Sequence, residues 1–315
     1  MKLFIDRLID QINIKKSHVI VGLDPVYDNF PQSIRKESVI SLKEIGNAII
    51  KFNTELIYAI HDLVPAIKPQ VAFYERYGIE GLKAFTKTVD YGKKKGLIVI
   101  EDAKRNDIGS TATAYSDGHI GKIKIFNQTK SVFDLDAITV NPYLGSDGIM
   151  PFINDIQRYQ KGIFVLVKTS NPSSVELQDI KVLYKRKTYR LYEVVSKLVN
   201  EWGQKCIGKY GYSSVGAVVG ATFPGDSKKL RKIMPHTYFL VPGYGAQGGG
   251  ASDVINCFNN DGYGALIAAS RSINYAFKND KKFKDKDFAD AAREAVIKMN
   301  KDINNELKKK KLLNW

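Results

Sequence analysis

Cysteine and histidine are scarce in this sequence of 315 residues, which contains two and four of them, respectively. Cys206 and Cys257 are too few for a disulfide framework, so a reduced, cytoplasmic setting is expected. Neither cysteine has the surroundings of an activated nucleophile, and the histidines lack the spacing of metal ligands: they are His18, His61, His119 and His236. These absences argue against cysteine catalysis and against a metal site.

Long apolar runs and linkers are also missing. No run approaches the ~18 residues that a membrane span requires. Charged residues interrupt the first seven positions too early for a signal peptide. No Gly-x-Gly-x-x-Gly follows the first expected strand, which removes the dinucleotide-binding fingerprint. Because no Pro/Gly/Ser-rich linker divides the chain, we expect one domain over residues 1–315, without a membrane segment.

The net charge of +15 raises the question of a nucleic-acid partner. The lysines are spread along the chain, and the one dense block is Lys308–Lys311 near the C-terminus. Such a block is typical of a solvated helix face or tail. A basic surface also favours the capture of a small anionic substrate. We therefore expect no nucleic-acid partner, although a basic nucleic-acid-binding protein remains an alternative that a salt-sensitive shift with nonspecific DNA would reveal.

Eight short apolar segments have the composition of buried strands in a parallel sheet. They are Val19–Asp24, Ala66–Lys68, Leu97–Lys104, Ala137–Asn141, Ile163–Lys168, Gly216–Gly220, Tyr238–Val241 and Ala265–Ala269. Most segments between them have helical spacing of apolar residues. Eight strands that alternate with helices predict an α/β fold, a single (β/α)8 TIM barrel. An open, doubly wound sheet is the alternative, because periodicity alone cannot close a barrel.

Three further segments extend the expected barrel. Residues Leu3–Ile14 predict an extra N-terminal helix before the first strand, and Phe288–Lys311 predict a terminal helix. The stretch Asn171–Tyr212 is long for one connection between strands, which indicates an insertion after the fifth strand.

The most informative motif follows the apolar run Leu97–Ile100. Asp102 and Lys104 are two residues apart, so both project from the same face at the carboxyl end of the third strand, and Asp107 follows in the loop. Carboxyl ends of parallel strands are where α/β proteins place their chemistry. A surface ion-pair cluster is the plainer interpretation, but other strand ends also bear polar groups.

The last two strands indicate a phosphate site. The seventh is followed by the glycine-rich loop Pro242–Gly250 and the eighth by Arg271. Glycines such as Gly245 and Gly248 let backbone N–H groups approach an anion, and Gln247 and Arg271 supply further donors. Loops after strands seven and eight are the usual phosphate site of this barrel.

These residues together resemble the orotidine 5′-phosphate decarboxylase family, in its longer-chain bacterial-type branch, from about Asp24 to Arg271. The family's pattern Asp-x-Lys-x-x-Asp-Ile-x-x-Thr is intact, as Asp102, Lys104, Asp107, Ile108 and Thr111. Further matches to the family are at single positions: Asp24, Lys68, Ser170, Gln247 and Arg271. The sequence departs from the family pattern at two positions: Gly109 stands where many members have proline, and Pro69 follows Lys68. Neither departure changes a charged residue. Because proline is disfavoured within a central strand, we expect the second strand to end at Lys68.

The resemblance implies decarboxylation of orotidine 5′-monophosphate to UMP, the last step of de novo pyrimidine synthesis, with no cofactor. Lys104 would stabilise a carbanion at C6 and protonate it, with Asp102, Asp107 and Lys68 completing the charge network. The remaining matches would bind substrate: Asp24 and Lys68 the ribose, Ser170 the pyrimidine, and Gln247 and Arg271 the phosphate.

The resemblance also implies a homodimer with shared active sites, because residues that match Asp107 and Thr111 reach into the neighbouring subunit's site. Two rivals stay open beside it. Sugar-phosphate decarboxylases and aldolases share the Asp-x-Lys-x-x-Asp strand but resemble metal enzymes with a carboxylate where this chain has Lys68. A catalytically silent nucleotide-binding protein would have no need of Lys104 between two carboxylates.

Overall fold

The computed structural model describes residues 2–36, 38, 41–222, 224–245, 249–280 and 282–315. Two compact units make up the chain. The first comprises Met1–Ile9, Lys104–Ala268 and Asn305–Trp315, and the second comprises Asp10–Ala103 and Ala269–Asn304. The four boundaries between the units fall inside two helices and two strands. The expectation of one domain over the whole chain stays a prediction.

Eight parallel strands close into a barrel with helices between them, a (β/α)8 TIM barrel as the sequence predicts. Around the barrel they follow the order β1-β12-β11-β10-β7-β6-β3-β2. Their bounds are β1 Val19–Leu23, β2 Ala66–Pro69, β3 Ile98–Arg105, β6 Ala137–Val140, β7 Gly162–Lys168, β10 Ser213–Val219, β11 Thr237–Val241 and β12 Ala265–Ala269. Nearly all of their residues are buried, which is why these segments read as continuous apolar runs.

Each unit contains its own set of paired strands. In the second unit β1 pairs with β2 and β2 with β3, with Ile20 opposite Ala66 and Ala66 opposite Ile98. In the first unit β6, β7, β10, β11 and β12 pair in that order. All of these pairs are parallel, so within each unit the strand ends that bear polar residues lie along one edge.

The helices follow from apolar spacing and from local caps. Helix α2 (Leu42–Ile60) begins after Ser41, whose side chain accepts a hydrogen bond from the Glu44 N–H, and it buries one apolar face. The other helices are α1 Phe4–Lys15, α3 Ala72–Glu75, α4 Gly78–Lys94, α5 Gly109–His119, α6 Ser146–Tyr159, α7 Val175–Gln178, α8 Leu191–Gly203, α9 Pro224–Ile233, α10 Ala251–Val254, α11 Arg271–Asn274 and α12 Phe288–Lys309. The expected extra helix at the N-terminus is α1, and the expected terminal helix is α12.

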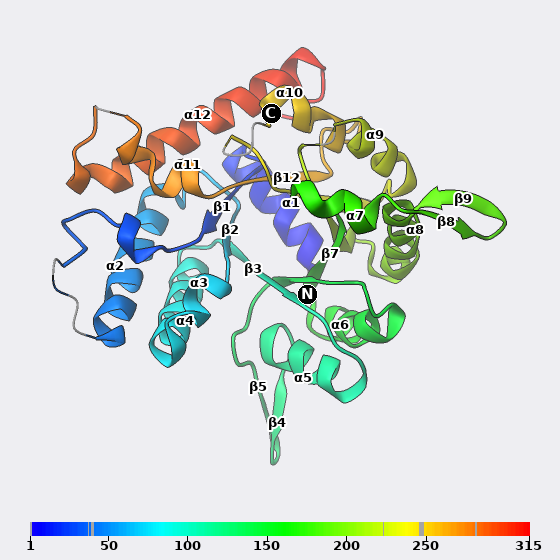
Figure 1. Ribbon diagram of the computed structural model, residues 1–315, viewed down its shortest axis with the longest axis horizontal. Helices are drawn as coiled ribbons and strands as arrows, with labels where there is room; N and C mark the ends of the chain where they lie inside the picture. Colours follow the sequence, from blue (N-terminus) through cyan, green and yellow to red (C-terminus); the bar gives the residue numbers. More distant parts are fainter. Residues whose placement is uncertain (1, 37, 39–40, 223, 246–248, 281) are drawn as a thin grey trace. The chain divides into compact units, whose positions relative to one another are not determined.

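Two hairpins extend the first unit (Figure 1). The insertion expected after the fifth barrel strand contains α7 and the hairpin of β8 (Lys181–Tyr184) and β9 (Lys187–Arg190). A second hairpin, β4 (Ile123–Ile125) with β5 (Gln128–Lys130), was not expected. Its strands have three residues each and are mostly exposed, so they have no buried apolar run that a sequence pattern could reveal.

The second barrel strand ends one residue later than expected, and several other strand ends also differ from the expected bounds by one residue. Pro69 belongs to β2, where it stands opposite Leu23, whereas the sequence led us to end the strand at Lys68. Proline lacks an N–H donor but its carbonyl can still accept a hydrogen bond, so a strand tolerates it as its last residue. No helix among the described residues is long and apolar enough to cross a membrane.

Candidate active site

An ion pair joins the carboxyl ends of β2 and β3 in the second unit. Lys68 Nζ lies 2.8 Å from Asp102 Oδ2, and the two side chains are only 8% and 14% exposed. The parallel pairing continues past Pro69 as a bridge between Gln70 and Asp102, which fixes the two strand ends side by side. Two of the residues predicted from the sequence are therefore in direct contact.

Burial and charge act in opposite directions on Lys68. Burial alone would lower the pKa of this lysine, but the negative charges of Asp102 and Asp24, together with the hydrogen bond to Asp102, outweigh it and raise the pKa above its ordinary value. Lys68 is therefore a cation at neutral pH. It can donate hydrogen bonds to a polar ligand while its charge is balanced by Asp102 on β3 and by Asp24, which follows β1.

Asp24 follows β1. Its backbone is held by Tyr275, and one oxygen of its carboxylate accepts no hydrogen bond from the described residues. The Tyr275 hydroxyl donates to the Asp24 carbonyl oxygen at 3.2 Å and accepts from the Val26 N–H at 2.9 Å. Among the described residues, buried Asp24 Oδ1 has no hydrogen-bond partner. Buried polar atoms are rarely left unpaired in proteins, so this oxygen is suited to accept a hydrogen bond from a ligand hydroxyl.

Lys104 has a backbone conformation that is unusual for a lysine in a strand. Its φ is +51°, in the left-handed region that residues with a side chain avoid. The Lys104 N–H donates a 3.0 Å hydrogen bond to Thr139 Oγ1 on β6, and the lysine side chain is exposed. Such a conformation costs roughly 1–3 kcal/mol and is characteristic of functional sites. Thr139 therefore stabilises the turn of the backbone that presents the lysine.

Asp107 and Thr111 lie beyond Lys104 in the first unit, in the loop before α5 and in α5 itself. Asp107 is half-buried, and its Oδ1 accepts a 2.8 Å hydrogen bond from the Ile108 N–H, whereas Thr111 is exposed. Helix α6 approaches this loop closely, because a Cβ on Gly148 would lie 2.9 Å from the Asp107 carbonyl oxygen. The loop that holds Asp107 is thus packed against α6.

Ser170 comes two residues after Lys168, the last residue of β7, and is half-buried. Its neighbour Thr169 is bonded to Gln178 through both its N–H and its hydroxyl. Gln178 belongs to α7 of the insertion. A segment that the sequence marked only as extra length therefore contacts the loop that contains Ser170.

The candidate phosphate residues are described in part. Gly245 has a φ of +73°, which favours glycine, and its N–H donates a 2.8 Å hydrogen bond to the Gly249 carbonyl oxygen. Gln247 and Gly248 lie outside the described residues. Arg271 is the first residue of α11, directly after Ser270, and is exposed.

Three residues next to the candidate site were not predicted from the sequence: Thr139, Gln178 and Tyr275. Each holds the backbone of a candidate residue or of its neighbour through a side chain. Only their positions near strand ends could have drawn attention to them. No group of three or more histidine, cysteine, aspartate or glutamate residues in the described part of the chain could hold a metal ion.

A (β/α)8 barrel with lysines and aspartates at the carboxyl ends of neighbouring strands is typical of barrel enzymes that act on small molecules. The family model described as "Orotidine 5′-phosphate decarboxylase / HUMPS family" matches residues 17–284. The chain belongs to this family.

Individual comparisons agree with the family match. The orotidine 5′-phosphate decarboxylase of Caldicellulosiruptor bescii is 44% identical over 283 residues, which cover 88% of this chain and 90% of that protein. The solved OMP decarboxylase of Leishmania donovani is 30% identical, with a TM-score of 0.68 and coverage of 95% of this chain and 98% of the other. Leishmania donovani UMP synthase is 31% identical with a TM-score of 0.71, and the match covers 95% of this chain but only 56% of that longer protein.

Proposed function

We propose that this chain decarboxylates orotidine 5′-monophosphate to UMP, the last step of de novo pyrimidine synthesis. Its family membership and the names of its relatives support this reaction. The observation that carries the proposal is the buried Lys68–Asp102 ion pair, followed two residues later on the same strand by Lys104. Binding a nucleotide alone does not require this alternation of charges.

The reaction breaks the bond between C6 and the carboxylate and leaves the electron pair on C6. That pair lies in an sp2 orbital outside the π system, so the protein has to stabilise it electrostatically. Enzymes typically lower barriers by about 8–23 kcal/mol, and this reaction requires a large reduction. A positive charge at about 4 Å, in an effective dielectric of about 20, contributes roughly 4 kcal/mol.

Lys104 is the proposed source of that charge and of the proton. Its ammonium group stabilises the carbanion as CO2 departs and then donates a proton to C6, which yields UMP and a neutral amine that solvent reprotonates. Asp102, two residues earlier, and an Asp107 contributed by the neighbouring subunit hold the ammonium group in position. Lys68 balances the charge of Asp102.

The other candidate residues bind the substrate. Asp24 and Lys68 bind ribose hydroxyls, which is supported by the unpaired Oδ1 of Asp24 and by the charge on Lys68. Ser170 contacts the edge of the pyrimidine. The phosphate is bound by Gln247 and Arg271 and by the glycine loop that includes Gly245 and Gly248. This binding energy, far from C6, can drive closure of the site around the reacting carbon.

The enzyme is proposed to act as a cytoplasmic homodimer, without a nucleic-acid partner, in which Asp107 and Thr111 contribute to the neighbouring subunit's site. Support comes from the surface around the Asp107 loop. Ile108 in this loop, Tyr143 in the segment before α6 and Met150 in α6 are exposed apolar residues. Large exposed apolar side chains on neighbouring segments are typical of protein interfaces.

The test is the loss of the ultraviolet absorbance of orotidine 5′-monophosphate when purified protein is added in the presence of EDTA. We expect rapid loss with the wild type and a rate lower by about 10⁴-fold or more with Lys104→Ala, since a proton donor alone contributes roughly 10²–10⁴-fold and charge stabilisation adds to it. The Lys104→Ala protein should still bind UMP. Lys301→Ala, at an exposed position of α12, is the matched control.

Two outcomes would count against the proposal. Appreciable turnover by folded Lys104→Ala would remove Lys104 as the proton donor. Wild-type protein that is inactive with EDTA but becomes active on a sugar phosphate when Mg²⁺ is restored would favour the metal-dependent relatives.

A further inference from the structure

We propose that Gln178, in the insertion after β7, is a positioning residue that fixes the loop containing Ser170 and thereby sets the affinity for the pyrimidine ring. The inference rests on the proposed function, because it assumes that Ser170 contacts the pyrimidine. It concerns a residue in a segment that the sequence marked only as additional chain length.

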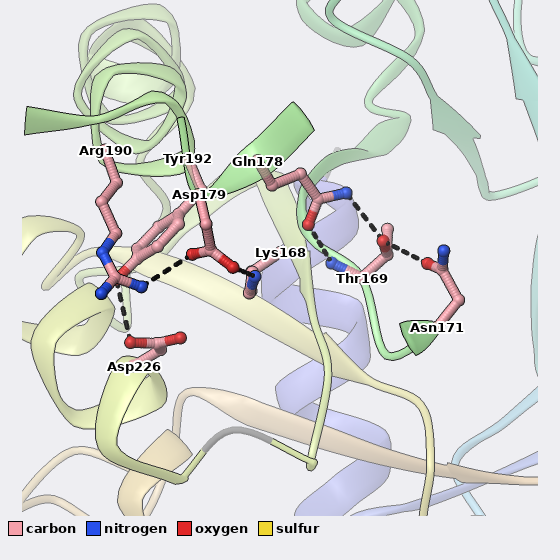
Figure 2. A network of polar contacts seen from close by, with 8 residues as sticks. All are labelled: Lys168, Thr169, Asn171, Gln178, Asp179, Arg190, Tyr192 and Asp226. Carbon is pink, nitrogen blue, oxygen red and sulfur yellow. Dashed lines mark hydrogen bonds and ion pairs between the residues drawn. The ribbon is translucent and has the colours of Figure 1, made fainter. Parts of the chain in front are cut away.

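Gln178 holds Thr169 by two hydrogen bonds at once (Figure 2). The Thr169 N–H donates to Gln178 Oε1 at 3.0 Å, and Gln178 Nε2 donates to Thr169 Oγ1 at 2.7 Å. The Thr169 hydroxyl in turn donates to Asn171 Oδ1 at 2.7 Å. The residues on both sides of Ser170 are therefore linked to each other and to Gln178. A primary amide suits this arrangement, because it offers an acceptor and a donor on neighbouring atoms.

Gln178 is itself held in place by the residue that follows it. Asp179 Oδ2 lies 2.7 Å from Lys168 Nζ at the end of β7, and Asp179 Oδ1 lies 2.9 Å from the guanidinium of Arg190 at the end of β9. Figure 2 shows Asp179 between these two cations. Through Asp179, the insertion is bonded both to the end of barrel strand β7 and to its own hairpin. These two ion pairs, which we call the tie, hold the residue next to Gln178 in place.

Lys168, the barrel residue of this tie, is fully buried. The Lys168 side chain is 0% exposed, and its Nζ lies 5.3 Å from the centre of the Tyr192 ring. The register between β7 and β10 shifts next to Lys168, since Val218 stands opposite Leu166 but Val219 opposite Lys168. A shift of this kind re-aims side chains at strand ends. A buried cation of this type requires its carboxylate partner, so the tie is costly to break.

A glycine confines Ser170 on another side. A Cβ on Gly220, which follows β10, would lie 2.9 Å from Ser170 Cβ and 3.0 Å from both Ser170 Cα and Ser170 N. The Gly220 N–H also donates a 2.8 Å hydrogen bond to the Lys168 carbonyl oxygen. Ser170 is thus packed against a backbone with no room for a side chain, while Gln178 fixes the preceding residue. Small displacements of a positioning group can lower activity markedly.

The experiment measures dissociation constants for UMP and for ribose 5-phosphate, which has the same phosphate and sugar but no pyrimidine. The variants are Gln178→Ala, Gln178→Glu, Ser170→Ala and the double variant Ser170→Ala/Gln178→Ala. Glu176→Ala, at an exposed position of the same short helix, is the matched control. Thermal melting of each variant establishes that it is folded, and kcat/KM for orotidine 5′-monophosphate is measured in parallel.

We expect Gln178→Ala to weaken UMP binding about tenfold, the effect of losing one or two hydrogen bonds, and to leave ribose 5-phosphate binding unchanged. Gln178→Glu keeps the acceptor for the Thr169 N–H and should give an intermediate value. In the Ser170→Ala background, Gln178→Ala should have little further effect, because Gln178 acts through Ser170. Glu176→Ala should match the wild type.

Several results would overturn the inference. Equal weakening of UMP and ribose 5-phosphate binding by Gln178→Ala would indicate a general structural role, and full additivity with Ser170→Ala would show independent action. Unchanged UMP binding in Gln178→Ala but weakened binding in Ser170→Ala would refute the role of Gln178 alone. Unchanged UMP binding in Ser170→Ala would refute the assignment of Ser170 and with it that of Gln178. Normal UMP binding without any wild-type turnover would instead refute the proposed reaction.

Discussion

Lys68 and Asp102 form an ion pair 2.8 Å long between neighbouring parallel strands, with little of either side chain exposed. Removing two charges from water is costly, and a buried pair seldom repays the full cost by mutual attraction. A hydrophobic pair of similar volume would give the folded protein an equal or greater free energy of unfolding. The pair is therefore better explained by function, since it presents a fixed charge pattern at the strand ends.

Removing one partner of this buried pair should destabilise the protein more than removing one partner of an exposed ion pair. Lys68→Met or Asp102→Asn removes the 2.8 Å partner of a buried charge, which costs up to about 3–5 kcal/mol in the free energy of unfolding because other charged groups compensate that charge only in part. The exposed ion pair Lys83–Glu80 is the matched control, and Lys83→Ala should cost less than about 1 kcal/mol. Urea denaturation measures both values. Equal costs at the two sites would mean that the Lys68–Asp102 pair is well hydrated in solution.

The hydroxyl of Thr139 should matter for turnover although it has no proposed contact with substrate. Thr139→Val removes the acceptor of the Lys104 N–H while keeping the shape of the side chain, so the left-handed conformation of Lys104 loses its support. We expect kcat/KM to fall by about tenfold, as for the loss of a partly buried hydrogen bond. Thr139→Ser keeps the hydroxyl and should restore most of the activity. Identical kinetics for the valine and serine variants would contradict this role.

Arg271 should contribute to the binding of the substrate phosphate and not to folding. Its side chain is exposed, so Arg271→Ala should leave the melting temperature unchanged. The loss of a charge-assisted hydrogen bond, about 1.5–3 kcal/mol, corresponds to a fall in kcat/KM of roughly 10- to 150-fold. Ser272→Ala, at the next exposed position, is the control. A kcat/KM equal to that of the wild type would refute the phosphate assignment.

The tie between the insertion and the barrel should be sensitive to acid. Burial would raise the pKa of Asp179, but the hydrogen bonds and positive charges of Lys168 and Arg190 outweigh it and hold the pKa below its ordinary value of 3.8. A depressed pKa means that the stabilisation is present above 3.8 and is lost as pH falls through the lower folded-state pKa. The free energy of unfolding of the wild type should therefore exceed that of Asp179→Asn at neutral pH, and this difference should shrink below 3.8. A difference that stays constant in acid would show that the charge of Asp179 is not what stabilises the tie.

The barrel strands and most of the charged candidate residues could be predicted because each has a local signature. Buried parallel strands are continuous apolar runs, and Asp102, Lys104 and Asp107 stand within six residues of one another. The supports of these residues have no such signature. Thr139 is an ordinary residue of a buried strand, and Gln178 is one polar residue in a long insertion, so their roles depend on contacts between segments distant in sequence. The left-handed backbone of Lys104 could not be predicted either, since lysine is not a residue that favours it.

The proposal of shared active sites can be tested by mixing two inactive subunits. If Asp107 of one subunit completes the site that contains the other subunit's Lys104, each active site takes its Lys104 from one subunit and its Asp107 from the other. Lys104→Ala and Asp107→Ala then damage the contributions of different subunits to a site. A mixed dimer then contains one site with both defects and one intact site. After unfolding and refolding of an equal mixture, half of the dimers are mixed, so about a quarter of wild-type activity should return. Each variant refolded alone should stay inactive. A mixture that is as inactive as its components, although size-exclusion chromatography shows dimers, would place Asp107 and Lys104 of the same subunit in one site.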